Sequence, residues 1–332
     1  MKRIWYIGAL SVTAGVLIYA GVATSDTESI PGIQEMEFSY GAVIRNIPPD
    51  AQSLQVWIPL PRDDARQSVS ALRIESPFPF REVTDSEYGN RLLFCELSSG
   101  LPDSLPFTMT FRVRRYEAAP LAPADSGAAL RERLRRFLAP DALVPIDGAI
   151  AREADSVTRG AATPMDEARA LYDHVLRTMR YDKSGSGWGQ GDAVFACTER
   201  RGNCTDIHSL FIGMARASGI PARFVIGFPL PPGELAGDIP GYHFWAEFYV
   251  DDFGWVPLDI SEAIRHPEKK EYFFGRLDPN RVAFTVGRDI QVTTSSGVKR
   301  LNYFIYPHTL LDGQPFDGAI HKFAFTDYLQ QP

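Results

Sequence analysis

The sequence predicts an α+β protein in which a helix packs on an antiparallel sheet. Residues 33–117 contain several runs of alternating apolar side chains, separated by Pro-rich segments, which is typical of antiparallel strands. Apolar side chains then recur at the three- and four-residue steps of helices up to about residue 217. From Pro221 onward, apolar and polar side chains alternate again. Strands, then helices, then strands again indicate segregated helix and sheet layers.

The amino terminus reads as an export segment at residues 1–28. Lys2 and Arg3 precede an apolar stretch at residues 4–23, and Gly21 to Ala23 offers a small-residue cleavage site. Positive charges before the apolar run keep that end cytoplasmic, so the remaining chain is exported. The stretch is also just long enough to span a bilayer, so a signal peptide and a membrane anchor through residues 4–23 both stay open. In a Gram-negative bacterium the expected compartment is the periplasm.

Residues 33–117 are predicted to form a small β-sandwich. Tyr88-Gly-Asn90 is a predicted turn within it, and the Pro- and Ala-rich residues 118–125 are expected to be a linker. The half-buried strands are marked by Met36, Phe38, Tyr40, Ala42 and Ile44, by Leu54, Val56, Ile58 and Leu60, and by Phe107, Met109, Phe111 and Val113.

Residues 118–270 are predicted to form a second domain, which begins with helices. One short helix is marked by Leu130 to Leu138, and another begins where Thr163 caps and Pro164 takes the first turn. A third, amphipathic helix begins at Cys204 and ends at Gly219, with Ile207, Leu210, Phe211 and Met214 on its apolar side.

Cys204 lies in the first turn of that third helix. The unpaired N–H groups and the positive end of the helix dipole favour an anion there, so thiolate is favoured over thiol. A thiolate is the nucleophile that acyl transfer needs.

His243 and Asp259 are the predicted partners of this thiol. The run from His243 to Val250 alternates, which sets His243 on the less apolar face of a strand. A three-residue loop at 251–253 would pair Val250 with Gly254 and place Asp259 diagonally across from His243, within reach of one hydrogen bond. A loop of two or four residues would send Asp259 to the opposite face.

With that geometry, His243 would draw the proton from Cys204, and Asp259 would hold the other N–H of the ring. An oxyanion hole would combine the backbone N–H of Cys204 with one side-chain donor. Trp188 and Gln190, in the Gly-rich run before Cys204, are the candidates for that donor.

These residues resemble the transglutaminase-like superfamily of papain-type cysteine enzymes over roughly residues 160–265. The resemblance implies a Cys-His-Asp triad at Cys204, His243 and Asp259, a papain-like fold, and amide acyl chemistry without metal or organic cofactor. The family includes proteases, amidases and members without shown activity. Four blocks occur in the family's order: Arg200-x-Gly-x-Cys-Thr-Asp206, Ala215 to Arg223, His243-x-Trp-x-Glu-x-Tyr249 and Gly254-Trp-x-Pro-x-Asp259.

Other interpretations of the same residues exist. Cys204 and His208 stand four apart on one helix and, with Cys197, could be zinc ligands, although no fourth ligand is evident. An exported chain could also pair Cys197 with Cys204 in a disulfide, which would silence the thiol. Arg200 and Arg201 could bind an anionic substrate, but capping and solvating the loop is the better interpretation. No metal and no such disulfide are expected.

The charge distribution and the last part of the chain add two further expectations, about partners and about the sheet. The net charge is −7 and Lys and Arg are dispersed, so a nucleic-acid partner is not expected. Residues 271–332 read as short strands that extend the catalytic sheet, and they resemble extensions in bacterial members of the family.

The sequence therefore predicts an exported cysteine enzyme that acts on peptide or side-chain amides of a protein or peptide substrate. Hydrolysis is favoured over cross-linking, since water is abundant. The alternative from another class is a catalytically silent binding or scaffolding module, with the β-sandwich as the binding part.

Overall fold

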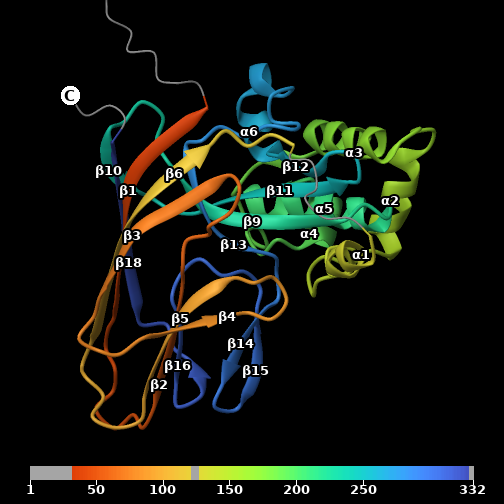
Figure 1. The fold of residues 1–332 in the computed structure, drawn as a ribbon. Coiled ribbons are helices and arrows are strands. Elements are labelled where there is room, and N and C mark those ends of the chain that lie inside the picture. Colours follow the sequence, from red (N-terminus) through yellow and green to blue (C-terminus); the bar gives the residue numbers. More distant parts are fainter. Residues whose placement is uncertain (1–31, 121–126, 329–332) are drawn as a thin grey trace, which may run out of the picture. The chain divides into compact units, whose positions relative to one another are not determined.

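A computed structural model describes residues 32–120 and 127–328, whose strands form two five-stranded sheets, one four-stranded sheet and two two-stranded sheets (Figure 1). The predicted export segment at residues 1–28 lies outside the described residues. Within the described ranges, none of the helices combines the length and the apolar character needed to cross a membrane.

The first five-stranded sheet has its two longest strands in the middle. Alternate side chains of β1, from Met36 to Ile44, are buried, as the sequence predicts, and Phe38 lies opposite Phe111 of β6. The order is β10 (Ala236–Ile239), β18 (Ala319–Asp327), β1 (Ile33–Ile44), β6 (Leu105–Tyr116) and β3 (Gln67–Glu75).

The second five-stranded sheet supplies the other half of the sandwich. Leu54, Val56 and Ile58 of its central strand share one buried cluster with the apolar side chains of β1 and β6. The order is β17 (Gln314–Pro315), β16 (His308–Leu311), β2 (Leu54–Pro59), β5 (Arg91–Leu97) and β4 (Arg81–Thr84).

The sandwich uses strands from three parts of the chain, so the predicted division at residues 117 and 271 does not describe it. The prediction that the whole tail extends the catalytic sheet is wrong for β16, β17 and β18. In that tail, β13 (Arg281–Val286) joins the catalytic sheet, and β14 (Ile290–Thr294) pairs with β15 (Gly297–Leu301). Strand β18 pairs with β1, and β16 pairs with β2. Strands β1 and β2 each offer an edge to these partners, and local periodicity does not reveal which distant strand will pair with such an edge.

The helices gather beside the four-stranded catalytic sheet (Figure 1). This sheet has the order β12 (Gly254–Leu258), β11 (His243–Val250), β9 (Ala222–Pro229) and β13. The helices are α1 (Ala128–Arg135), α2 (Gly148–Thr158), α3 (Pro164–Thr178), α4 (Ala193–Glu199), α5 (Cys204–Ala217) and α6 (Ile260–Arg265), with a short 3₁₀ turn at Pro267–Lys269. Strands β7 (Arg180–Tyr181) and β8 (Arg201–Gly202) form a short parallel pair.

Helix α5 is central to this part of the fold. It begins at Cys204, as predicted, but it is not amphipathic in its surroundings, because every residue from Cys204 to Arg216 is buried. It packs on the catalytic sheet, where the ring centroids of Phe211 and Phe248 are 6.1 Å apart, and α2, α3 and α4 also contact it. Its polar side chains therefore need partners inside the protein.

The β11–β12 hairpin has the register that the sequence predicts. Val250 pairs with Gly254, so the loop is the three residues 251–253. Strand β11 differs from the prediction in being buried on both faces. Gly227 of β9 allows the close approach of β13, since a Cβ there would lie 1.9 Å from the carbonyl oxygen of Val282.

Candidate active site

Cys204 is the first residue of α5, and a reciprocal capping box holds that helix start. The Asn203 side chain accepts from the backbone N–H groups of Thr205 and Asp206, and the Asp206 carboxylate accepts from Asn203 N at 3.0 Å. The same carboxylate accepts from Gly189 N at 2.7 Å and Gly191 N at 2.9 Å. One buried acid therefore ties the Gly-rich loop to the helix start that carries the thiol.

His243 and Asp259 meet in the way that the hairpin register implies. The Nε2 atom of His243 lies 2.7 Å from Oδ2 of Asp259, and both residues are buried. Asp259 ends the hairpin as the N-cap of α6 and accepts from Glu262 N at 3.0 Å. The hydroxyl of Ser261 donates to it at 2.9 Å. The hydrogen bond to Asp259 leaves Nδ1 as the free nitrogen of the His243 ring.

The Cys204 thiol interacts with the His243 ring and contributes to its pKa shift, so the three predicted residues belong to one cluster. Burial by itself lowers the pKa of His243, but the Asp259 carboxylate and the hydrogen bonds to Asp259 and Cys204 outweigh it and raise the pKa. Burial raises the pKa of Asp259, yet His243 and Arg281 hold it well below its usual range. The raised pKa makes His243 a better acceptor for the proton of the Cys204 thiol.

Arg281 is a fourth participant that the sequence did not point to. Its Nη1 donates to Oδ2 of Asp259 at 3.0 Å, and its Nη2 pairs with Asp278 at 2.7 Å. Arg281 begins β13, and no local pattern marks it as a partner of a residue in another strand. It gives the buried Asp259 carboxylate a second cation.

His208 links two parts of the candidate site through both nitrogens of its ring. It is fully buried, its Nδ1 donates to the carbonyl of Cys204 at 2.8 Å, and its Nε2 accepts from Ile260 N at 3.0 Å. Burial lowers the pKa of His208 to about 4, although Asp259 opposes this shift. A neutral His208 therefore joins the helix of the thiol to the segment just after Asp259.

The two predicted oxyanion donors lie in the loop before α4. The indole N–H of Trp188 donates to the carbonyl of Gly185 at 3.2 Å, so it is already engaged. Gln190 has an exposed side chain and contributes its backbone carbonyl to Arg288 at 2.9 Å. Their role as oxyanion donors stays a prediction.

Arg288 holds the carbonyl side of the same loop. It is fully buried, and its Nη1 donates to the carbonyl of Gly191 at 2.5 Å and to the Ser209 hydroxyl at 3.0 Å. Asn302 donates to the carbonyl of Gln190 at 2.8 Å. Asp206 and Arg288 therefore bind the N–H groups and the carbonyls of the loop, respectively.

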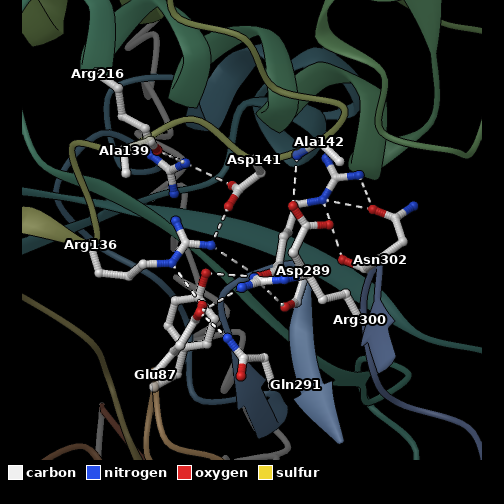
Figure 2. A network of polar contacts seen from close by, with 12 residues as sticks. Glu87, Arg136, Ala139, Asp141, Ala142, Arg216, Asp289, Gln291, Arg300 and Asn302 are labelled. Carbon is white, nitrogen blue, oxygen red and sulfur yellow. Dashed lines mark hydrogen bonds and ion pairs between the residues drawn. The ribbon is translucent and has the colours of Figure 1, made fainter. Parts of the chain in front are cut away.

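A wider polar network surrounds this region (Figure 2). Asp141 lies between two arginines, accepting from Arg136 at 2.6 Å and from Arg216 of α5 at 2.7 Å. Glu87 of the sandwich then binds Arg136 at 2.9 Å and Arg300 of β15 at 3.3 Å. The network joins the sandwich, the end of α5 and the β14–β15 hairpin.

Cys197, one of the residues of the zinc alternative, contacts an acidic side chain. The Cys197 thiol donates to Glu153 at 3.1 Å, and burial together with Glu153 raises the pKa of Cys197 to about 11. Arg200 binds the same Glu153 with both terminal nitrogens, at 2.6 and 2.7 Å. The three cysteines, all within the described ranges, are free thiols. Arg200 and Arg201 bind protein groups, and Arg201 does so through the carbonyls of residues 184 and 186.

Comparison with known proteins shows a domain match and a fold match. Residues 151–260 match the family described as the transglutaminase-like superfamily. An "uncharacterized protein" of Haemophilus influenzae is 25% identical over 371 aligned residues, covering 100% of both chains.

Two solved structures are similar at low sequence identity. A "putative cysteine protease" from Cytophaga hutchinsonii has a TM-score of 0.55 and 16% identity, covering 89% of this chain and 100% of its own. The periplasmic domain of TgpA from Pseudomonas aeruginosa has a TM-score of 0.38 and 20% identity, covering 72% of this chain and 91% of its own. The first of these supports the α+β fold alone.

Proposed function

Residues 151–260 form a domain of the transglutaminase-like superfamily, and from this premise we propose that the protein is a cysteine-dependent acyl-transfer enzyme. Its substrates are peptide or side-chain amides, and Cys204, His243 and Asp259 are its catalytic residues. The observation that carries the proposal is the hydrogen bond of 2.7 Å between His243 and Asp259, with the Cys204 thiol interacting with the same imidazole ring.

In the first half of the reaction, the proton of the Cys204 thiol moves to Nδ1 of His243. The sulfur then bonds to the carbonyl carbon of the amide, and the electron pair of the carbonyl moves onto its oxygen. When this oxyanion collapses, the carbon–nitrogen bond breaks, and the imidazolium gives its proton to the leaving ammonia or amine. The product on the enzyme is a thioester.

In the second half, water or an amine attacks the thioester, and His243 removes its proton. The Cys204 sulfur leaves and recovers its proton from the His243 imidazolium. Asp259 stays ionised throughout and keeps Nε2 protonated, with Arg281, Ser261 and the N–H of Glu262 occupying its other acceptor positions. Water as acceptor gives hydrolysis, which is the outcome we favour.

The oxyanion of the tetrahedral intermediate needs preorganised donors. The backbone N–H of Cys204 is suited to this role, because the first N–H groups of a helix have no partner within the helix. The loop that contains Trp188 and Gln190 would supply a second donor. Asp206 and Arg288 would act on this loop as positioning residues.

A second function has one observation in its favour. Cys204 retains only 3% of its surface exposure, which fits a catalytically silent binding or scaffolding module whose thiol is covered. The two functions differ in whether a small electrophile reaches an ionised Cys204, and this can be measured directly.

The first test is labelling by iodoacetamide at pH 6, followed by peptide mass analysis. We expect rapid labelling of Cys204, loss of that label in Cys204→Ala, and no change in Cys197→Ala. Cys197 is the matched control, since Glu153 and burial raise the pKa of Cys197 to about 11. Equal labelling of wild type and Cys204→Ala would contradict an activated Cys204 and favour the silent module.

The second test is turnover of a mixed peptide library, measured as new amino termini and released ammonia. Cys204→Ala and His243→Ala are each expected to lower the rate by about 10³-fold or more, because the members of such a triad act as a unit. Turnover that survives either substitution would place the chemistry elsewhere in the chain.

We also propose that the protein works outside the cytoplasm. Lys2, Arg3 and the apolar residues 4–23 support export, whether as a cleaved signal or as an anchor. Fractionation of expressing cells combined with amino-terminal sequencing separates the two fates. A full-length protein confined to the cytosolic fraction would contradict export.

A further inference from the structure

A cleft of about 670 Å³ lies between the catalytic sheet and the sandwich. Its walls come from β11, β12, α1 and the sandwich residues 62, 64–66 and 86–88. Glu247 and Tyr249 line it from the strand that carries His243. Glu247 is four residues beyond His243, or roughly 13 Å along an extended strand, so the cleft is separate from the triad.

Two arginines share one carboxylate at the wall of this cleft. Glu247 forms an ion pair with Nη1 of Arg66, and it accepts from Arg223 at 2.7 Å through Nε and at 2.5 Å through Nη2. Arg66 is 6% exposed and Glu247 is 5% exposed, so these charges are largely removed from water. Buried charges require partners, and here one positive charge is left over.

A second group of charges beside the cleft has the same imbalance. Asp64 pairs with Arg62 at 2.6 Å, and Arg115 is the further cation near Asp64 and Glu247. Burial and the neighbouring arginines lower the pKa of Arg115 to about 10, although Asp64 opposes this shift. Four arginines therefore face two carboxylates, which leaves a local excess of two positive charges in a chain of net charge −7.

The remaining acid of the wall does not cancel this excess. Glu87 is occupied by Arg136 at 2.9 Å and by Arg300 at 3.3 Å, and its Oε1 also accepts from Gln291 (Figure 2). The cleft is cationic even though the whole chain is acidic. The positive electrostatic potential of these arginines favours an anionic ligand.

Flat apolar surface lies next to these charges. The Arg223 guanidinium carbon lies 3.8 Å from the ring centroid of Trp255, and the Trp255 ring contacts Phe137 at 5.0 Å and Tyr249 at 5.5 Å. The Tyr249 hydroxyl and the Arg66 Nε are two of the eleven buried side-chain atoms of the described residues that have no hydrogen-bond partner. Buried donors without an acceptor are uncommon in folded proteins.

We propose that this cleft is a second binding site, for a small organic anion in which a carboxylate is joined to a flat apolar group. The volume is within the range of small-molecule pockets. The carboxylate neutralises the excess charge of the arginines. The flat group lies against Trp255 and Phe137.

Such a carboxylate can belong to a free aromatic acid or to the carboxyl terminus of a peptide that ends in an aromatic residue. Titration calorimetry on the purified chain would use 2-naphthoate for the first source and acetyl-Ala-Ala-Trp for the second. The neutral controls are 2-naphthamide and the carboxyl-terminal amide of the peptide. We expect at least one of the two anions to bind, and to bind more weakly at high salt. The affinity of its neutral control is expected to be lower by about tenfold or more.

Two variants test the location. Trp255→Leu and Arg62→Gln are each expected to weaken the anion about tenfold, whereas the matched controls Phe253→Leu and Arg91→Gln leave the affinity unchanged. Phe253 is exposed in the hairpin loop and Arg91 pairs with Glu82, and neither lines the cleft. Unfolding curves of all four variants verify that each is folded, and either test variant alone is decisive.

Cys204→Ala is expected to retain full binding, so the result is independent of the proposed catalysis. The proposal is overturned if neither anion binds, if the neutral controls bind as tightly as the anions, or if a folded Trp255→Leu or Arg62→Gln binds like wild type. Binding of the free acid, the peptide or both identifies the source of the carboxylate.

Discussion

Asp259 is the side chain on which the other parts of the candidate site converge. Its two oxygens accept from His243, Arg281, Ser261 and the N–H of Glu262, and it is fully buried. A buried carboxylate without such partners would be strongly disfavoured, so these contacts explain how an ionised acid persists beneath His243. The same contacts fix the orientation of the imidazole ring.

His208 gives a prediction about acid stability. Its pKa is lowered to about 4 in the folded protein and returns to its ordinary value near 6.5 on unfolding. Between these two values the unfolded chain binds a proton that the folded protein excludes. The contribution of His208 to the free energy of unfolding is therefore complete above about pH 6.5. It decreases by up to about 3 kcal/mol as the pH drops toward 4.

The check is urea unfolding of wild type and His208→Gln at several pH values from 7 to 4. We expect wild type to be the more stable protein at pH 7 and the difference between the two to shrink on acidification. His266→Gln, a half-exposed residue beside Glu262 and Glu268, is the control that should follow wild type. A stability difference that does not change between pH 7 and 4 would contradict the assigned role.

At the scale of the element, the start of α5 is held by one acid, Asp206. Both oxygens of Asp206 accept backbone N–H groups, from Gly189, Gly191 and Asn203. Asp192, the N-cap of α4, accepts from Val194 and Phe195 through a single oxygen. The two acids look alike in the sequence but differ in how many of their oxygens are used.

We therefore expect Asp206→Asn to lower the free energy of unfolding by about 2 kcal/mol, because the amide NH₂ faces an N–H donor in either orientation. Asp192→Asn is the matched control and should cost about 0.5 kcal/mol or less, since the amide oxygen replaces the single acceptor. Denaturant unfolding measures both. Equal losses in the two variants would mean that the loop contacts of Asp206 do not contribute.

At the scale of the whole molecule, segments distant in the sequence complete the sandwich, and side-chain contacts join it to the catalytic sheet. Strand β18 pairs with β1 and β10, and β16 pairs with β2. The ring of Phe323 in β18 lies 4.7 Å from Tyr40 and 4.2 Å from Phe228 of the catalytic sheet. Gln67 of the sandwich also binds both backbone groups of Ala283 in β13. The two parts are expected to unfold together.

Truncation after residue 307 tests this expectation. It removes β16, β17 and β18, exposes the edges of β1 and β2, and uncovers the rings of Tyr40 and Phe228. We expect the truncated chain to lose its cooperative unfolding transition, whereas truncation after Tyr328 keeps a single transition by calorimetry. A truncated chain that unfolds in one sharp transition near the wild-type temperature would show that the sandwich closes without its tail.

The sequence by itself determined the features that depend on local chemistry. The start of α5 at Cys204, the Thr163 cap of α3 and the three-residue hairpin loop follow from capping, turn length and side-chain alternation within short windows. The contact between His243 and Asp259 was predictable because one hairpin carries both residues. The capping box of Asn203 and Asp206, and the hold of Asp206 on the Gly-rich loop, came only from the structure.

Only the tertiary structure decided which distant segments share a sheet or a buried charge. Arg281 reaches Asp259, Arg288 reaches Gly191, and β18 reaches β1, and none of these pairs has a periodicity or spacing that relates its members. The cationic cleft arises in the same way, from residues of the sandwich and the catalytic sheet. Long-range pairing is set by the complementarity of faces and charges once the chain has collapsed, and short sequence windows do not contain that information.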